Sequence, residues 1–527
     1  MAGSRLSTRV RSWLILMMKR IVSLVAVGVA LSPEIGGAEQ EMHSHPPPEK
    51  LGTVTFATSC AANVSHDFER AVALLHSFTY DVAEKAFRGV ATADPTCAMA
   101  HWGLAMVNWH QLWGPPDAED LSKGREEIAR AQQLSVKSER ERQFIAAAAA
   151  FFHDSDHVPV LVRAKAYEEV MKQAAHASPQ DIETQVFYAL SLLAIAAPED
   201  RAHSNQKLAA SILEPVYQAH PDHPGVAHYL IHACDSTELA PRGLAAARAY
   251  SKIAPSAPHA LHMPSHIFTR LGLWDDSIAS NSAARAAARS QGDVGEELHA
   301  MDYLTYAYLQ RGRQTDAQQV VASLKSMGAL LGKDFKVAYA ATAMPIRLSM
   351  EGHKWDAATA LQPLPESPPN IATLIYWARA EAKARSGHPK DVDGDITELR
   401  KCQQQLQAAG NAYWARQTEI LTQEAVAWQL AASSHGDEAV KTLRQAADAE
   451  DAVEKLPLTP GPIVPAREQL GDLLLSLKQP EQALKEYQAA LVSAPGRRGS
   501  LTGAVQAADM IGDVQLASRL RETLLKD

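Results

Sequence analysis

Three histidines stand close together in residues 258–268, which read PHALHMPSHIF. His259, His262 and His266 are separated by three and four positions, a spacing that places side chains on one side of a helix. Imidazole is a common ligand for zinc, copper, iron and nickel, and its second ring nitrogen is usually held by an outer partner. The stretch is therefore a candidate metal-binding face, and an ordinary polar helix face is the simpler alternative.

A similar pattern occurs one helix earlier. Pro224, His228 and His232 follow a P-x3-H-x3-H spacing, which the later stretch repeats 34 residues further on. Proline is favoured at the first position of a helix because its missing N–H is not needed there. Residues 295–312 then carry His299 with carboxylates and tyrosines at helical spacing. Two histidine pairs in register, beside a third histidine-bearing helix, favour a functional site over chance.

The candidate metal ligands are the histidines of these three segments and two acidic residues near them. They are His228, His232, His259, His262, His266, His299, Asp235 and Asp302. This set suits zinc, copper or iron better than calcium or magnesium. Pro264 lies inside the second histidine helix and should kink or unwind it. Nitrogens that converge within about 4 Å of one point would indicate a metal, and histidines that point apart would indicate peptide recognition.

The elements that must carry these residues are helices. The chain has 527 residues, of which 46% are hydrophobic and 21% charged. Helix-length, alanine-rich segments alternate with short breaks, and strand-like alternation is nearly absent. A chain of this length with that pattern is typical of a helical repeat array. We therefore predict an all-α fold of antiparallel helix pairs.

Two stretches resemble the tetratricopeptide repeat (TPR), which has a period of 34 residues. Residues 80–106 place Phe87 and Pro95 at the diagnostic intervals, and residues 465–495 fit the pattern at each diagnostic place. The chain is similar to the TPR superfamily over most of residues 66–526. Stretches such as LHMPSHIF and PGPIVPAREQLGDLLL also resemble a group of exported bacterial TPR proteins without a settled activity.

The resemblance implies a superhelical solenoid with a concave groove. In TPR proteins the fifth and ninth positions of the first helix of each repeat line that groove, with the second and twelfth beside them. This alignment would place His228, His232, His259, His262, His266 and Asp235 there, and His299 is three residues out of register. The resemblance also implies that the groove binds a peptide or a partner protein. Further groove contacts expected from the same alignment and from aromatic position are Glu296, Tyr303, Tyr306, Trp102, Trp109 and His110.

The first residues read as an export signal. Basic residues precede the apolar stretch IVSLVAVGVAL, and the small residues Gly36, Gly37 and Ala38 follow it. This order is typical of a secretory signal peptide, and about 11 apolar residues fall short of the ~20 that span a bilayer. We expect a periplasmic or secreted protein without stable membrane insertion. The predicted organisation is 1–38 signal peptide, 39–65 Pro-rich leader, 66–335 array with the His-rich groove, and 336–527 second TPR-like array.

The cysteines, the absence of enzyme motifs and the net charge limit the functional classes to which the protein could belong. In an oxidising compartment Cys60 and Cys97 are candidates for a disulfide, whereas Cys234 and Cys402 read as buried thiols. The chain has no CxxC, HExxH, GxSxG or GxxxxGK[ST] motif. These motifs are typical of zinc ribbons, zincins, α/β-hydrolases and P-loop nucleotidases, so their absence argues against those classes of protein. A formal net charge of −9 without a basic stripe argues against nucleic-acid binding.

Two functions are consistent with this sequence. The first is an exported TPR solenoid that acts as a binding or scaffold module and carries a His-rich transition-metal site in its groove. The second is a metal-dependent enzyme, hydrolytic or redox, in which the metal keeps an open position for water or substrate. The fold does not choose between them, because function depends on the site.

Overall fold

The computed structural model describes residues 49–526, apart from 329 and 331–334. The chain divides after Pro48 into two units, and the described residues belong to the second. The predicted signal peptide, residues 1–38, and the first part of the predicted leader lie outside the described residues.

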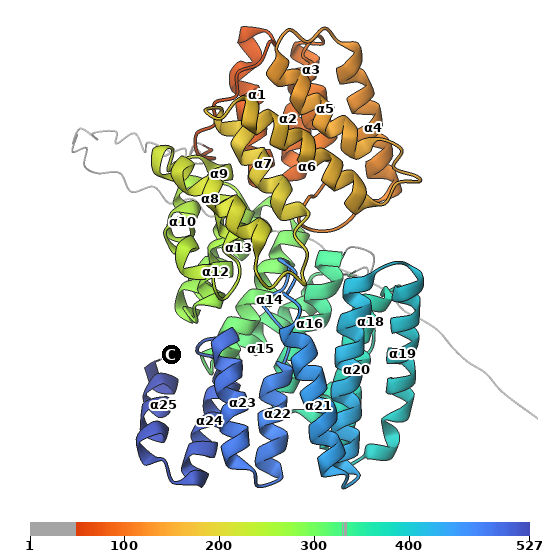
Figure 1. The fold of residues 1–527 in the computed structure, drawn as a ribbon, viewed down its shortest axis with the longest axis vertical. Helices are drawn as coiled ribbons and strands as arrows, with labels where there is room; N and C mark the ends of the chain where they lie inside the picture. The colour runs from red at the N-terminus through yellow and green to blue at the C-terminus, as the bar shows by residue number, and fades with distance from the viewer. Residues whose placement is uncertain (1–48, 329, 331–334, 527) are drawn as a thin grey trace, which may run out of the picture. The chain divides into compact units, whose positions relative to one another are not determined.

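The first part of the described chain is a series of helices joined by short turns (Figure 1). After the short 3-10 helix η1 (Ala62–Val64) they are α1 Ser65–His76, α2 Tyr80–Ala93, α3 Ala98–Met106, α4 Ala118–Gln133, α5 Glu139–Phe152, α6 Val160–Ala177, α7 Ile182–Ala194 and α8 Ser204–Ala219. The histidine-bearing part follows as α9 Pro224–Ala233, α10 Ala240–Ile253, α11 Pro258–His262, α12 Pro264–Arg270, α13 Trp274–Gln291 and α14 Val294–Gln310.

The remaining helices run to the end of the described chain. They are α15 Gln314–Ala322, η2 Ser323–Ser326, α16 Phe335–Glu351, α17 Trp355–Thr359, α18 Pro369–Arg385, η3 Pro389–Asp391, α19 Asp393–Ala408, α20 Ala412–Ala432, α21 Gly436–Asp451, α22 Ala466–Ser476, α23 Pro480–Ser493, α24 Arg498–Ile511 and α25 Val514–Lys526. Consecutive helices pack against each other, as α22 to α25 do in Figure 1. The prediction of an all-α fold of helix pairs is confirmed.

Small residues let the helices of a pair approach closely. Tyr487 of α23 lies against Gly471 of α22 and Gly503 of α24, where an added Cβ would come within 2.6 Å and 2.2 Å of its ring. Phe87 of α2 meets Gly103 of α3 in the same way, at 2.4 Å. An aromatic ring thus fills the space that each glycine leaves, which is the packing that the repeat pattern predicts.

We expect Gly471→Ala to lower the free energy of unfolding by about 1–3 kcal/mol, because the new methyl group overpacks the Tyr487 ring. The matched control is Gly89→Ala, a helical glycine whose added Cβ meets nothing within 4 Å. That change should stabilise by up to about 1 kcal/mol, since alanine is the better helix former. Thermal unfolding followed by circular dichroism compares the two. Equal effects of both changes would contradict this account of the packing.

The segment between α21 and α22, residues 452–465, reaches back to the histidine-bearing helices. Lys455 Nζ lies 2.8 Å from Asp235, and Tyr303 donates a hydrogen bond to the carbonyl oxygen of Thr459 at 3.1 Å. The segment therefore covers helices that are about 150 to 220 residues earlier in the chain. It encloses the region where an open groove was expected.

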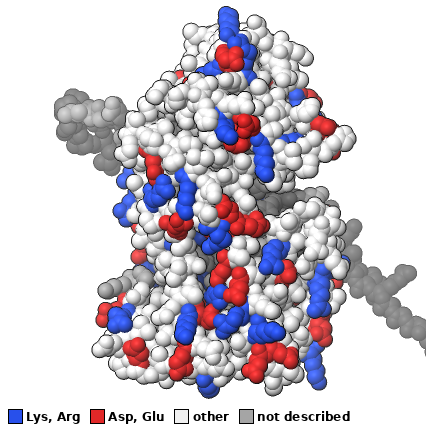
Figure 2. Space-filling model, in the orientation of Figure 1, with Lys and Arg blue, Asp and Glu red and all other residues white. Residues whose placement is uncertain are grey.

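The described helices and one face of the molecule bear on membrane insertion and on charge. Among the described helices, none is both long and apolar enough to cross a bilayer. On the face shown in Figure 2, Lys and Arg side chains are interspersed with Asp and Glu side chains. That distribution is consistent with the predicted absence of nucleic-acid binding, which stays a prediction.

Candidate metal centre

Local sequence sets the direction of the histidine side chains. Pro224 opens α9, and the side chain of His223 accepts a hydrogen bond from the N–H of Val226 as its N-cap. Pro264 separates α11 from α12, as predicted, because it supplies no N–H to the helix. Met263 between them keeps helical angles, φ −52° and ψ −36°. The chain therefore continues in a helical path, and histidines on both sides of the break face the same region.

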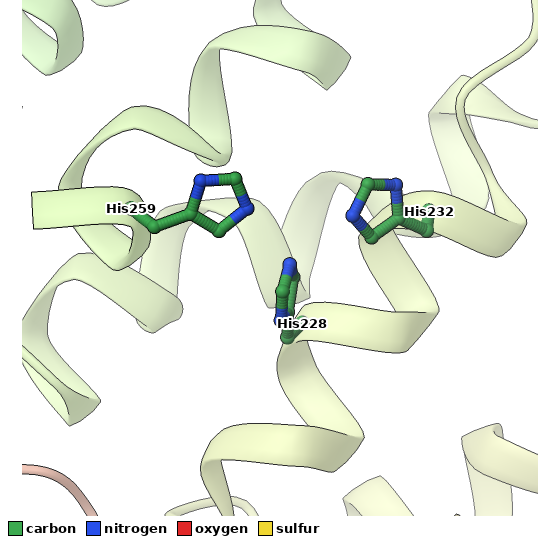
Figure 3. A group of neighbouring side chains, drawn as sticks. All are labelled: His228, His232 and His259. Carbon is green, nitrogen blue, oxygen red and sulfur yellow. The ribbon is translucent and has the colours of Figure 1, made fainter. Parts of the chain in front are cut away.

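The first histidine group consists of His228 and His232 of α9 and His259 of α11. One nitrogen from each ring lies within 4.8 Å of the other two. Figure 3 shows the three rings turned toward a common space between the two helices. All three residues are buried, with exposed fractions of 0%, 8% and 2%. The side chains converge, and a group of this geometry could hold a metal ion.

Outer hydrogen bonds fix the tautomer that two of these rings adopt when neutral. His228 Nδ1 donates to the carbonyl oxygen of His76 at 2.6 Å, and His259 Nδ1 donates to Glu296 at 3.1 Å. The proton of each neutral ring is therefore on Nδ1, and Nε2 keeps its lone pair. Neither of these Nε2 atoms, nor either nitrogen of His232, has a hydrogen-bond partner among the described residues. Metal-ligating histidines are typically held in this manner.

The second histidine group consists of His262, His266 and His299, from α11, α12 and α14. One nitrogen of each lies within 4.8 Å of the other two, and Nε2 of His262 is 3.0 Å from Nε2 of His266. His262 Nδ1 is held by Asn281 of α13 at 2.7 Å, and His266 Nδ1 by Asp235 at 2.9 Å. His262 and His266 therefore follow the plan of His228 and His259, with an outer partner on Nδ1.

The surroundings favour the neutral form of the histidines, which is the form that binds metals. Burial, and then the neighbouring histidines, hold the pKa values of His228, His232 and His262 well below the ordinary value. His299 has a similarly lowered pKa for the same first reason. Burial also lowers the pKa of His266, to about 4. These five histidines are therefore lone-pair donors at neutral pH.

A third group of buried residues is fully hydrogen-bonded and serves structure. Glu183 of α7 accepts from His76 Nε2 at 2.8 Å and from His223 Nε2 at 2.9 Å. The other nitrogen of His76 pairs with the Tyr229 hydroxyl at 3.0 Å, and that of His223 accepts from the N–H of Val226. Because each ring nitrogen has a protein partner, this group offers no free lone pair to a metal.

Aromatic side chains cover the first histidine group. The Phe78 ring lies 4.4 to 5.9 Å from the three imidazoles, and its φ of 53° is rare for a bulky residue. Phe78, Trp113 and Glu296 also line a cavity of about 1010 Å³. Lys336 closes one edge, with its Nζ 3.9 Å from the Trp113 ring centroid and 2.8 Å from Glu296. A large aromatic cavity therefore adjoins the metal candidate.

The two acidic candidates have other partners. Asp235 holds His266 and Lys455, and it acts as an outer partner of the second group. Burial opposes its charge, but Lys455 and neighbouring cations keep its pKa well below the usual range. Asp302 pairs with Arg347 at 2.9 Å and is not grouped with the histidine nitrogens. Arg347 holds one carboxylate oxygen of Asp302, and the other oxygen is buried without a hydrogen-bond partner among the described residues. The role of Asp302 as a ligand therefore stays a prediction.

The expected groove contacts fall in four places. Glu296, Trp109 and His110 line the large cavity, and Tyr306 lines a smaller one of about 170 Å³. Tyr303 is buried beside the second histidine group, 4.8 Å from the His262 ring. Trp102 is fully buried among phenylalanines, so its expected groove contact is corrected to a core position.

Sequence reasoning missed several residues that support the site. Asn281 and the carbonyl of His76 hold ligand candidates, and Phe78 covers them. None of these carries a local motif. Glu183 does carry a local signal. It is an acidic residue at the start of the apolar stretch IETQVFYALSLLA, and an acidic residue is unusual on a buried helix face. Separately, Cys60 and Cys97 form a disulfide, and Cys234 and Cys402 are buried free thiols.

Comparisons with known proteins add little to this geometry. No family model matches the chain, and no curated protein matches it. Solved structures with a similar arrangement include the human IFIT1 dimer with m7Gppp-AAAA, at 11% identity, a TM-score of 0.35, and coverage of 81% of this chain and 90% of that one. Another is Naa15/Naa10 bound to HypK-THB, at 11% identity, a TM-score of 0.24, and coverage of 88% and 68%. The fold assignment rests on the helices themselves.

Proposed function

We propose that this chain is a metal-binding protein that holds a transition-metal ion at the first histidine group. One observation carries the proposal: four ring nitrogens of three buried, converging histidines have no hydrogen-bond partner among the described residues. Leaving buried polar atoms unpaired costs about 1–3 kcal/mol each, and a bound ion removes that cost for the coordinating nitrogens. The three imidazoles suit zinc, copper or iron and leave an open coordination position.

A second candidate function is a metal-dependent enzyme, hydrolytic or redox, and the large cavity supports it. Its volume of about 1010 Å³ lies in the range of small-molecule sites. Phe78 and Trp113 line it, and both rings contact His259. An organic molecule in the cavity would therefore lie next to the histidine group. Binding of a peptide or partner protein in a concave groove stays a prediction.

We also propose that the protein functions after export, in the periplasm or outside the cell. The Cys60–Cys97 disulfide supports this compartment, because such bonds persist in oxidising surroundings. The predicted signal sequence supports it from the residues alone.

Elemental analysis of the purified full chain tests the metal proposal. Wild-type protein prepared without chelator and loaded with zinc or copper should retain metal after desalting, and His228→Gln/His232→Gln should lose one equivalent per chain. The matched control is His66→Gln/His157→Gln, which changes two histidines that are 92% and 79% exposed and should retain the wild-type content. A wild-type protein that retains no zinc and no copper would overturn the proposal.

A further inference from the structure

We infer that the six histidines form a dinuclear centre, in which the second histidine group holds a second metal ion beside the first. This inference rests on the proposed function of the first group. It is carried by a separate set of observations, the hydrogen bonds of His262 and His266 to their own outer partners and the 3.0 Å distance between their Nε2 atoms.

The outer partners leave the close pair of nitrogens without a proton between them. Asn281 donates through Nδ2 to the carbonyl oxygen of Ser277 at 2.8 Å, so its Oδ1 is the acceptor for His262 Nδ1. Asp235 is acceptor-only, so His266 Nδ1 must donate to it. Each neutral ring thus carries its proton on Nδ1. The two Nε2 atoms, 3.0 Å apart, then face each other with their lone pairs.

Two facing lone pairs repel unless a cation lies beside both of them. A single proton can bridge only two nitrogens, but His299 brings a third within 4.8 Å of the pair. Three converging imidazole nitrogens are the donor set of a metal ion. Tyr303 closes the site from α14, with its ring 4.8 to 5.5 Å from the three imidazoles.

The two groups are neighbours, and helix α11 contributes a histidine to each of them. The ring centroids of His232 and His266 are 5.8 Å apart, and those of His259 and His262 are 5.9 Å apart. His259 of the first group also stacks on His299 of the second at 6.5 Å. Since a ligand of each group contacts a ligand of the other, ions bound at the two groups would be adjacent.

The carboxylates near the six histidines indicate which metal ions the centre would bind. The nearby carboxylates are already paired with protein cations, Glu296 with Lys336, and Asp235 with Arg270 and Lys455. Little negative charge is therefore left for hard cations such as calcium or magnesium, and the donor set is entirely imidazole nitrogen. Among the divalent ions that imidazole suits, copper binds most tightly.

The test compares copper content and magnetic coupling in the full chain. Wild-type protein loaded with Cu(II) alone should retain two ions per chain. His262→Gln/His266→Gln and His228→Gln/His232→Gln should each retain one. Two adjacent Cu(II) ions couple magnetically, so the wild-type electron paramagnetic resonance intensity should fall well below its copper content, whereas each variant should give full intensity. The exposed-site control, His66→Gln/His157→Gln, should behave as the wild type does.

The outcomes separate the two proposals. A wild type that retains one ion, which His262→Gln/His266→Gln also retains, overturns the second site and leaves the first. Two ions with full, uncoupled intensity overturn the dinuclear arrangement. A wild type that retains none overturns the proposed function as well. Far-ultraviolet circular dichroism checks the fold. His299→Gln, which should also reduce the content to one ion, replaces His262→Gln/His266→Gln if that variant does not fold.

Discussion

Arg347→Met should destabilise the protein by about 3–5 kcal/mol, the range found when one partner of a buried ion pair is removed. The Arg347 side chain is fully buried in α16 and donates to Asp302 at 2.9 Å. It also donates to the carbonyl oxygens of Gly461 and Pro462, both at 3.1 Å. Methionine fills much of the volume but leaves a buried carboxylate and two carbonyls without a donor.

Thermal unfolding followed by circular dichroism measures this loss, and limited proteolysis within residues 452–465 reports whether the segment loosens. Arg88→Met is the control, because Arg88 pairs with Glu84 on an exposed helix face and should contribute within about 0.5 kcal/mol. If Arg347→Met and Arg88→Met shift unfolding equally, the segment is not held by this guanidinium.

Glu183→Ala is expected to cost a similar amount, about 3–5 kcal/mol, because two buried imidazole N–H groups lose their acceptor together. Glu183→Gln should cost less, since its amide oxygen still accepts from one histidine. Glu183→Ala should also alter the pH dependence of the free energy of unfolding. Burial opposes the charge of Glu183, but His76 and His223 hold its pKa below the ordinary value of 4.5. Its stabilising contribution is therefore complete above about pH 4.5 and is lost as the pH falls below it.

Thermal midpoints measured from pH 3 to pH 8 check this prediction. The difference between wild type and Glu183→Ala should be largest near neutral pH and should shrink in acid. Glu84→Ala, which removes a half-exposed carboxylate of an i,i+4 pair, should give a small difference at each pH. A gap between wild type and Glu183→Ala that widens as the pH falls would contradict the assigned hydrogen bonds.

Periodic features of this protein follow from the sequence alone. Helices follow from the spacing of apolar and polar residues that are close together in the chain. A repeat of 34 residues then places equivalent positions of neighbouring helices side by side. For that reason the six candidate histidines could be named, and the structure places them together in two adjacent groups. The helical break at Pro264 was predictable too, since it depends only on a missing N–H.

The tertiary structure decided the partners of those histidines. Asn281 reaches His262 across 19 residues, His76 reaches His228 across 152, and Lys455 reaches Asp235 across 220. No local pattern encodes such pairs, because each depends on how distant helices and the 452–465 segment pack. The same packing paired Asp302 with a guanidinium and enclosed the histidines where an open groove was expected. Helical spacing thus determined which imidazoles lie together, and long-range packing decided which of their nitrogens are left with a free lone pair.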